Sequence, residues 1–196
     1  MAIIMFVIMI LLIFTGTPVF VAMGVGCVIF ILTQDSISLV GIASQLFSGA
    51  NSFTLMAVPF YLLTGELMNS GGITRRIMDL AQAAVGQFWG GLAHVNILSS
   101  TVMAGMSGSA SADAATTSTI LIPEMVEKGY PKPFAAAVTA CSAVIGPVIP
   151  PSINMLIYAS AASVSVGKMF IAGILPGIVI CTYEMVVTYF IAKRRR

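Results

Sequence analysis

The sequence has 196 residues, of which 58% are hydrophobic and 8% are charged. Soluble domains carry about 25% charged residues, so this composition excludes a chain with an ordinary water-soluble surface and predicts a membrane protein. The formal net charge of +2 is too small to indicate nucleic-acid binding. The basic residues lie between or after apolar segments, as residues that flank a membrane do.

Residues that usually carry catalysis are scarce in this sequence. Cys27, Cys141 and Cys181 each lie in an apolar run without a C-x-x-C or Cys/His cluster, so we interpret them as small core residues. The single histidine, His94, fits a packed or interfacial side chain better than a catalytic one. We therefore predict that the chain is not an enzyme and carries no cofactor.

The first apolar segment, residues 1–32, lacks the basic start of a signal peptide and is expected to stay as membrane helix. Pro18 disrupts helical hydrogen bonding, so the segment forms either one long kinked helix or two short helices with a turn at 15–18. Residues 35–52 are of mixed polarity and are expected at the interface. Residues 53–68 form an apolar span with Pro59 inside, and we place Glu66 at the membrane interface.

Residues 73–88 have the pattern of an amphipathic helix. Its predicted apolar face consists of Ile73, Ile77, Leu80, Ala81, Ala84 and Phe88. The polar side chains lie mostly elsewhere, which is typical of a helix lying along the membrane surface. Trp89, the only tryptophan, ends this helix at an interface-like position.

Residues 90–122 contain two apolar arms, 92–106 and 110–122, separated by Ser107-Gly108-Ser109. Each arm is shorter than the roughly 20 residues that cross a bilayer, so we predict a re-entrant helical hairpin. A charged loop is expected at 123–133. The next apolar segment, 134–162, is interrupted by G-P-V-I-P-P at 146–151, and 166–192 form a final span before a basic tail.

The basic residues also predict the orientation of the chain. Arg75 and Arg76, Lys128 and Lys132, and the tail at 193–196 are expected in the cytoplasm by the positive-inside rule. The hairpin then enters from the cytoplasmic side and returns there. Lys168 stands alone on the opposite side, which the rule tolerates.

The two interruptions are the strongest functional signal. Backbone groups without helical partners are tolerated in hydrocarbon only where protein or water satisfies them. If the hairpin tip meets the broken helix, the converging hydroxyls and carbonyls belong to Ser107, Gly108, Ser109, Gly146, Pro150 and Pro151. Such oxygens suit a hard cation such as Na⁺, and interrupted apolar segments are typical of a transporter's midplane site. The alternative, two packing kinks with serines bonded to the preceding turn, stays open.

Two polar side chains near the breaks are further candidates. A carboxylate inside a membrane is a functional candidate by default, and Asp113 lies four residues beyond Ser109. We expect Asp113 to cap the second arm and to lend charge to the cation site from behind its ligands. Asn154 either reaches the site or makes a helix cap or an interhelical hydrogen bond. Gly173 and Gly177 form a small-residue pair, but the intervening proline weakens a packing interpretation.

Three segments carry a resemblance to a known family. They are N-S-F-T-L-M-A-V-P-F-Y-L-L-T-G-E-L-M-N-S-G-G-I, G-G-L-A-H-V-N-I-L-S-S-T-V-M-A-G-M-S-G-S-A-S-A-D-A-A and A-A-V-T-A-C-S-A-V-I-G-P-V-I-P-P-S-I. In content and order they resemble the large membrane subunit of tripartite ATP-independent periplasmic (TRAP) transporters, over nearly the whole chain. The likeness is greatest to members that handle organic acids, including C4-dicarboxylates and sialic acid.

The resemblance implies an elevator-type secondary transporter in the bacterial inner membrane that imports organic acids with Na⁺. A periplasmic substrate-binding protein delivers the substrate, and a small membrane subunit forms a scaffold beside the large one. The helix at 73–88 would match the family's surface arm, which links the scaffold to the moving domain. Carried over by motif, the Na⁺ site is formed by Ser107, Ser109, Gly146, Ile149 and Pro151. Gly108, Asp113 and Asn154 are placed around it or near the substrate.

The family's large subunit is about twice this length, with two inverted repeats, so we expect this chain to be the first repeat only and to require its second half. The expected fold is all-α, with about five transmembrane helices, the hairpin and the surface arm. We divide it into 1–72, largely scaffold; 73–89, the arm; 90–165, the hairpin and broken helix; and 166–196, the last span and tail. Alternatives are a related permease that needs no binding protein, and a remnant or assembly partner that does not transport.

Overall fold

The computed structural model describes residues 2–32 and 39–194, and throughout these residues the regular secondary structure is entirely helical. Ten helices, α1 to α10, follow one another along the described chain. The prediction of an all-α protein is therefore confirmed. The chain forms two compact units that divide between Asn51 and Ser52, and each is described by itself. The scaffold and transport roles that we assigned to parts of the sequence stay predictions.

The first unit contains α1 (Ala2–Phe14), α2 (Val19–Leu32) and α3 (Leu39–Ala50). Residues 1–32 form two helices rather than one, and the turn between them uses Gly16 at φ +83°. The hydroxyls of Thr15 and Thr17 donate to the carbonyl oxygen of Leu12 and so satisfy the end of α1. α1 and α2 pack closely at Gly26, where an added methyl group would lie 3.5 Å from the Met5 side chain.

Length limits which helices can cross a bilayer. α1 and α2 have 13 and 14 residues, or about 20 Å each at 1.5 Å per residue, against a hydrocarbon core of about 30 Å. Among the described residues one helix, α10 (Val166–Arg194), is long and apolar enough to span, or two if a helix pair interrupted near Asn51 is counted as one span. The predicted number of five crossings therefore stays a prediction.

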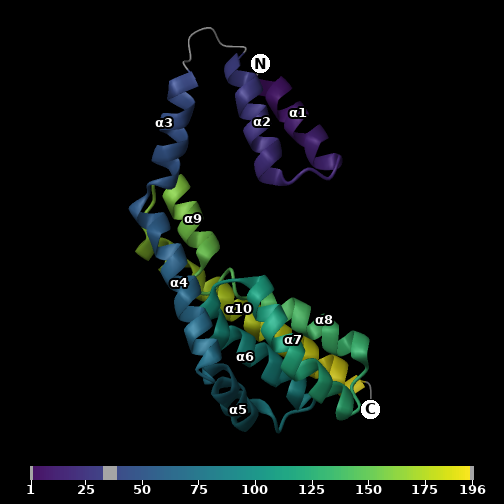
Figure 1. Ribbon diagram of the computed structural model, residues 1–196. Helices are drawn as coiled ribbons and strands as arrows, with labels where there is room; N and C mark the ends of the chain where they lie inside the picture. Colours follow the sequence, from purple (N-terminus) through teal and green to yellow (C-terminus); the bar gives the residue numbers. More distant parts are fainter. Residues whose placement is uncertain (1, 33–38, 195–196) are drawn as a thin grey trace. The chain divides into compact units, whose positions relative to one another are not determined.

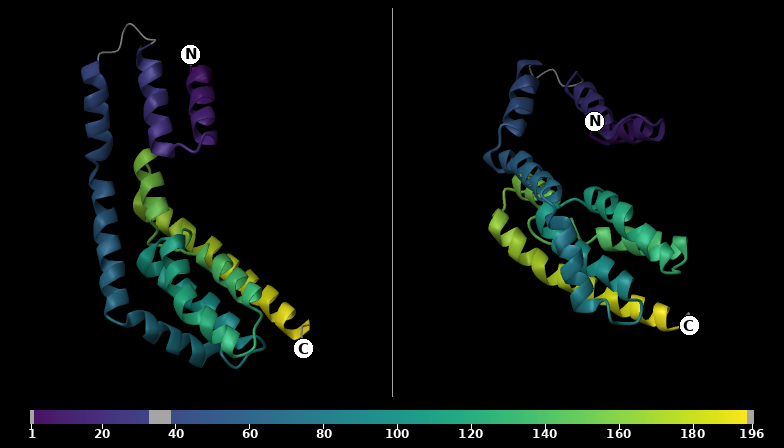
Figure 2. Two further views of the ribbon diagram at one scale, coloured as in Figure 1. Left: turned by 45° about the vertical axis from the view of Figure 1, so that its right-hand side comes forward. Right: turned by 60° about the horizontal axis from the view of Figure 1, so that its bottom comes forward.

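The second unit contains seven helices. These are α4 (Phe53–Ser70), α5 (Ile73–Val85), α6 (Gly91–Ser107), α7 (Ala110–Glu127), α8 (Lys132–Ala143), α9 (Ile153–Ala161) and α10. α6, α7, α8 and α10 lie side by side, while α4 runs past α6 and α9 (Figures 1 and 2). The main core cluster of this bundle comprises Leu92, Ala93, Ile97, Ala104, Met125, Ala135, Val138 and Ile145.

α5 is shorter than its prediction, and one of its faces is buried against protein. The helix ends at Val85, earlier than predicted. Its buried face is formed by Thr74, Met78 and Ala81, which pack on the hairpin helices, whereas Leu80 is 67% exposed. α5 is thus apolar on two sides: one contacts protein, and the other, which includes Leu80, is exposed. The predicted position of α5 along the membrane surface stays a prediction.

The charged loop after α7 is shorter than predicted. α7 continues through Pro123 to Glu127 and is followed by a turn at Gly129 with φ +87°. The Lys128 ammonium group lies 3.3 Å from the Glu124 carboxylate in an i,i+4 pair, a spacing that supports the last helical turn. The expected break at Pro123 is therefore absent.

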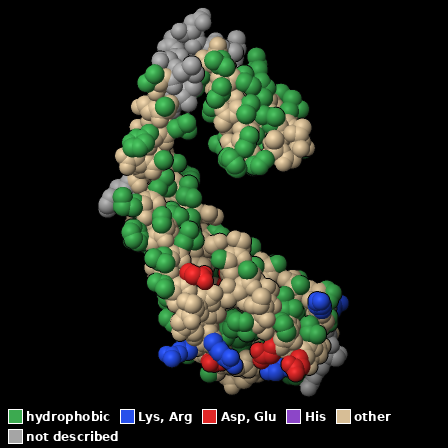
Figure 3. All heavy atoms as spheres, in the orientation of Figure 1, with side chains coloured by type: hydrophobic (Ala, Val, Ile, Leu, Met, Phe, Trp, Pro, Cys, Tyr) green, Lys and Arg blue, Asp and Glu red, His purple; other side chains and the backbone are tan. Residues whose placement is uncertain are grey.

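The surface of the second unit separates apolar from charged residues. Large apolar side chains on α4 and α10, such as Phe60, Leu67, Leu175 and Phe190, are each more than 60% exposed. Charged side chains gather at the end formed by α5 and the α7–α8 connection (Figure 3). A continuous apolar flank with charges at one end is the surface expected of a protein embedded in lipid.

Candidate functional site

The hairpin tip is formed where α6 ends at Ser107 and α7 begins at Ala110. Gly108 adopts the left-handed conformation, with φ +57°, which glycine reaches without a steric penalty. Ser109 is extended and is the N-cap of α7, because its hydroxyl accepts from the backbone N–H of Ala112 at 3.5 Å. The predicted interruption of the two arms at residues 107–109 is thus confirmed.

The second interruption lies between α8 and α9. α8 ends at Ala143, and residues 144–152 form turns until α9 begins at Ile153. The Ser152 hydroxyl donates to the carbonyl oxygen of Pro147 at 2.6 Å and accepts from the N–H of Met155 at 3.3 Å. Ser152 therefore links Pro147, inside this segment, to the first turn of α9. The Pro150–Pro151 peptide within the segment is cis.

The two interruptions touch each other. A methyl group added to Gly108 would lie 2.6 Å from the carbonyl oxygen of Pro151, and one added to Gly146 would lie 3.4 Å from the carbonyl carbon of Ser109. Both glycines are buried, so no side chain separates the two backbones at these points. The hairpin tip and the broken helix thus form one site, which we call the tip site, made of residues 107–109 and 146–151.

Free backbone oxygens are available at the tip site. The carbonyl oxygens of Gly146, Ile149 and Pro151 accept no hydrogen bond from the described part of the chain. The hydroxyls of Ser107 and Ser109 contribute further oxygens, and both residues are only half-buried. Each hydroxyl already accepts one hydrogen bond from a backbone N–H, that of Ser109 for Ser107 and that of Ala112 for Ser109, and keeps a further lone pair. Carbonyl and hydroxyl oxygens are the ligands that hard cations take. The structure thus brings all five predicted ligand residues into one region, and Na⁺ binding by them stays a prediction.

Two neighbouring helices hold the tip site in place. A methyl group added to Gly173 of α10 would lie 2.6 Å from the carbonyl oxygen of Val148, and one added to Gly177 would overlap the Ile149 side chain. The Gly173/Gly177 pair is therefore a packing surface for the 146–151 segment, although Pro176 stands between the two glycines. On the other side, Gly65 of α4 lies against the backbone of Met106.

A buried chain of polar side chains links α6 to α8 behind the tip site. The Asn96 amide donates to the Thr139 hydroxyl at 2.7 Å and accepts from the Ser142 hydroxyl at 3.0 Å. Ser100 then donates to Ser142 at 3.2 Å. All four residues are at most 2% exposed. Our sequence analysis missed this network, although polar residues one turn apart on two apolar helices are a signal for interhelical hydrogen bonding.

Asp113 is buried on α7 and is only 1% exposed. The nearby hydroxyl is that of Ser100, which donates to Ser142 instead, and neither carboxylate oxygen of Asp113 has a hydrogen-bond partner among the described residues. The helix cap that we expected from Asp113 is made by Ser109.

Two other residues named from the sequence take no direct part in the tip site. Asn154 is exposed in the first turn of α9 and is outside the residues that form the contact. His94 is buried, as predicted for a packed side chain, and its Nε2 lies 3.1 Å from the carbonyl oxygen of Trp89.

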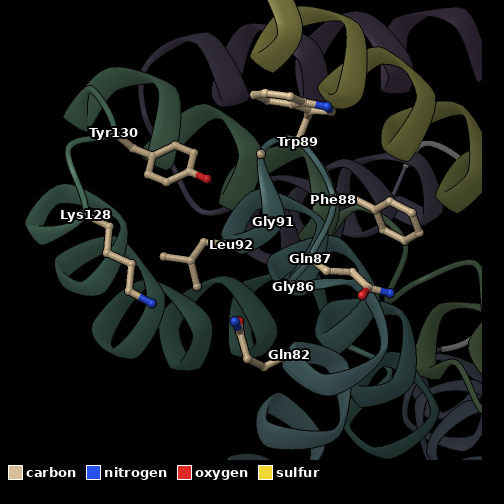
Figure 4. Close-up of a pocket in the computed structure, with 10 residues that line it drawn as sticks. Gln82, Gly86, Gln87, Phe88, Trp89, Gly91, Leu92, Lys128 and Tyr130 are labelled. Carbon is tan, nitrogen blue, oxygen red and sulfur yellow. The ribbon is translucent and has the colours of Figure 1, made fainter. Parts of the chain in front are cut away.

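A separate cavity of about 350 Å³ lies where the α5–α6 connection meets the α7–α8 connection. Lys128, Tyr130 and Gln82 direct their polar ends toward Leu92, while Phe88 and Trp89 point away from that group (Figure 4). These residues belong to the charged end of the unit, and none of the residues that line this cavity belongs to the tip site.

The fold and the tip site define a helical membrane protein whose interrupted helices meet, an arrangement found at the binding sites of secondary transporters. Comparison with known proteins agrees: the model of the family "Tripartite ATP-independent periplasmic transporter, DctM component" matches residues 6–196. The chain therefore belongs to the DctM family of TRAP transporter large permeases.

Three relatives show the range of the family. The chain is 43% identical to the sialic acid TRAP transporter large permease SiaM of Vibrio cholerae, over 94% of this chain and 43% of that protein. It is 40% identical to the C4-dicarboxylate permease DctM of Pseudomonas aeruginosa, over 89% and 41%. It is 42% identical to the 2,3-diketo-L-gulonate permease YiaN of Escherichia coli, over 78% and 36%. The chain thus spans less than half the length of these relatives.

Proposed function

We propose that this chain forms part of the large permease of a Na⁺-coupled transporter that imports an organic acid across a bacterial inner membrane. The observation that carries the proposal is the contact between Gly108 and the Pro151 carbonyl oxygen, because it joins two interrupted helices into one oxygen-lined site. Na⁺ bound there neutralises the partial negative charges of the carbonyls and fixes the hairpin tip against the broken helix.

The partners follow from the family. A periplasmic substrate-binding protein supplies the acid, a small membrane subunit stands beside the permease, and a second half of the large subunit completes the substrate site. Relatives named for sialic acid and for C4-dicarboxylates both match well, so the proposed substrate class is a carboxylate. The basic tail at 193–196 lies in the cytoplasm, together with Arg75, Arg76, Lys128 and Lys132, whereas Lys168 lies on the opposite side.

Uptake in cells tests this proposal. The native operon is expressed in a bacterial host that lacks its own organic-acid uptake, and accumulation of labelled sialic acid and C4-dicarboxylates is measured with an inward Na⁺ gradient and in K⁺ buffer. We expect accumulation of one of these acids only with Na⁺. Equal accumulation in K⁺ would contradict Na⁺ coupling.

Substitutions then assign the coupling ion to the tip site. Ser107→Ala with Ser109→Ala removes two hydroxyl ligands, and Ser109→Ala also removes the N-cap of α7, at a cost of about 1 kcal/mol. We expect a higher half-saturating Na⁺ concentration when uptake is normalised to the amount of protein in the membrane. Ser118→Ala is the matched control, because its hydroxyl only donates to the carbonyl oxygen of Ala115 on an exposed face of α7. An unchanged Na⁺ titration in the double variant would remove the tip site from the mechanism.

Gene context and deletion of the binding protein distinguish the alternatives. Na⁺-dependent uptake that persists without the periplasmic protein would favour a permease that works alone. If the complete operon gives no uptake although the protein is present in the membrane at a normal amount, the result would favour a chain that does not transport.

A further inference from the structure

The Asp113 carboxylate faces a second cavity, beside the tip site. This cavity has a volume of about 110 Å³ and lies between α4, α5, α6 and α7. Its polar lining is Glu66, Asn69, Thr74, Ser107, Asp113 and Thr116. Asp113 is buried and Glu66 is exposed, so Asp113 lies at the inner end of the cavity and Glu66 at its mouth.

The charge balance of this cavity is incomplete. Two carboxylates line it, and no lysine, arginine or histidine does so in the part of the chain that the structure describes. Both oxygens of Asp113 lack a hydrogen-bond partner there. A charge taken out of water is costly unless it is paired, and in membrane proteins such groups pair with one another, with backbone carbonyls or with transported ions. Asp113 therefore requires a positive partner that these side chains do not supply.

The oxygens around the cavity are arranged to receive a cation. The Thr74 hydroxyl donates to Asn69 Oδ1 at 2.9 Å, which fixes the Asn69 amide and leaves a second lone pair of that oxygen free. A volume of about 110 Å³ accommodates one small cation with waters, since a water occupies about 30 Å³. Carboxylate, amide and hydroxyl oxygens are hard ligands.

We propose that this cavity is a second Na⁺ site, in which Asp113 and Glu66 are the charged ligands and Asn69 contributes a neutral oxygen. The site is distinct from the tip site, where the ligands are carbonyl and hydroxyl oxygens without a formal charge. Ser107 borders both, so an ion in one site stabilises the hairpin end that shapes the other. When two Na⁺ ions bind to the same hairpin, the position of the hairpin depends on both ions.

Equilibrium binding of ²²Na⁺ tests this proposal. The protein is purified from its native operon with its accompanying subunits, and bound Na⁺ per protein is counted for the wild type and for Asp113→Asn, a substitution of nearly equal size. We expect Asp113→Asn to lower the count by one, Ser107→Ala with Ser109→Ala to lower it by one, and the combination to lower it by two. Glu127→Gln, an exposed carboxylate at the charged end of α7, should leave the count unchanged.

The outcomes separate this site from the tip site. A loss of one ion in Asp113→Asn supports the second site, even if the serine variants bind as many Na⁺ ions as the wild type. If Asp113→Asn and the serine double variant each lose one ion and their combination also loses only one, the two sites are a single site and the proposal is wrong. An unchanged count in Asp113→Asn overturns it in favour of a protonated carboxyl group. If Asp113→Asn does not fold, Glu66→Gln decides: it should raise the Na⁺ dissociation constant of one ion at least tenfold, and an unchanged binding curve overturns the proposal.

Discussion

Replacing Gly108 by alanine perturbs the contact between the two interrupted helices with a single methyl group. The left-handed backbone of Gly108, φ +57°, costs an L-residue about 1–2 kcal/mol. The new methyl group would also lie 2.6 Å from the Pro151 carbonyl oxygen, well inside van der Waals contact, and overpacking of this kind costs about 1–3 kcal/mol more. The expected loss in the free energy of unfolding is therefore about 2–5 kcal/mol.

Gly129→Ala separates the two contributions. Gly129 also has a positive φ of +87°, but no atom lies within 4 Å of an added methyl group, so only the backbone cost of about 1–2 kcal/mol applies. Unfolding in mixed micelles with graded sodium dodecyl sulfate measures both variants. A Na⁺ titration of the same samples should show a weaker apparent affinity only in Gly108→Ala, by about 5- to 150-fold for 1–3 kcal/mol. Equal stability and equal Na⁺ dependence of the two variants would refute the contact.

Three further substitutions, two of them with a matched control, test the packing of the helices by the same unfolding measurement. Asn96→Ala should cost about 1–3 kcal/mol, because it removes the centre of a buried hydrogen-bond network; no loss would argue against that network. Gly173→Ala should destabilise by about 1–3 kcal/mol through its clash with a backbone carbonyl, whereas Gly167→Ala on the same helix should stabilise by up to about 1 kcal/mol; equal effects would contradict the packing. Met78→Ala should cost about 2–5 kcal/mol, and Leu80→Ala, on the exposed side of α5, under about 1 kcal/mol; the reverse order would contradict the packing of Met78 on the hairpin helices.

The interruptions could be predicted because their causes are local. Gly108 has a positive φ between two helices, and the prolines of the 146–151 segment lack the backbone N–H that a helix requires. Such signals act within a few residues, so they also placed the turn at Thr15–Pro18 and the long last helix. Their meeting in space was an inference from chemistry, since free backbone groups in lipid need a common polar site.

Features that depend on neighbouring helices could not be predicted in the same way. The glycine pair on α10 was undervalued because Pro176 suggested a kink, whereas the pair packs against the irregular segment at Val148 and Ile149 and against Met155 of α9. The protein-facing side of α5, at Thr74, Met78 and Ala81, could not be told from its lipid-facing side, because lipid and protein both accept apolar side chains. Asp113 lacks a hydrogen-bond partner because Ser100 donates to the Ser142 hydroxyl and not to the Asp113 carboxylate. The spacing of these residues along the sequence does not determine which of the two accepts.

A cryo-electron microscopy map of the intact transporter in Na⁺, compared with one in choline, tests the central claim most directly. We predict density for an ion between Ser107, Ser109 and the carbonyl oxygens of Gly146, Ile149 and Pro151 in Na⁺, and its absence in choline with a loosened hairpin tip. An identical tip in both buffers without ion density, or a gap between Gly108 and Pro151 in Na⁺, would contradict it.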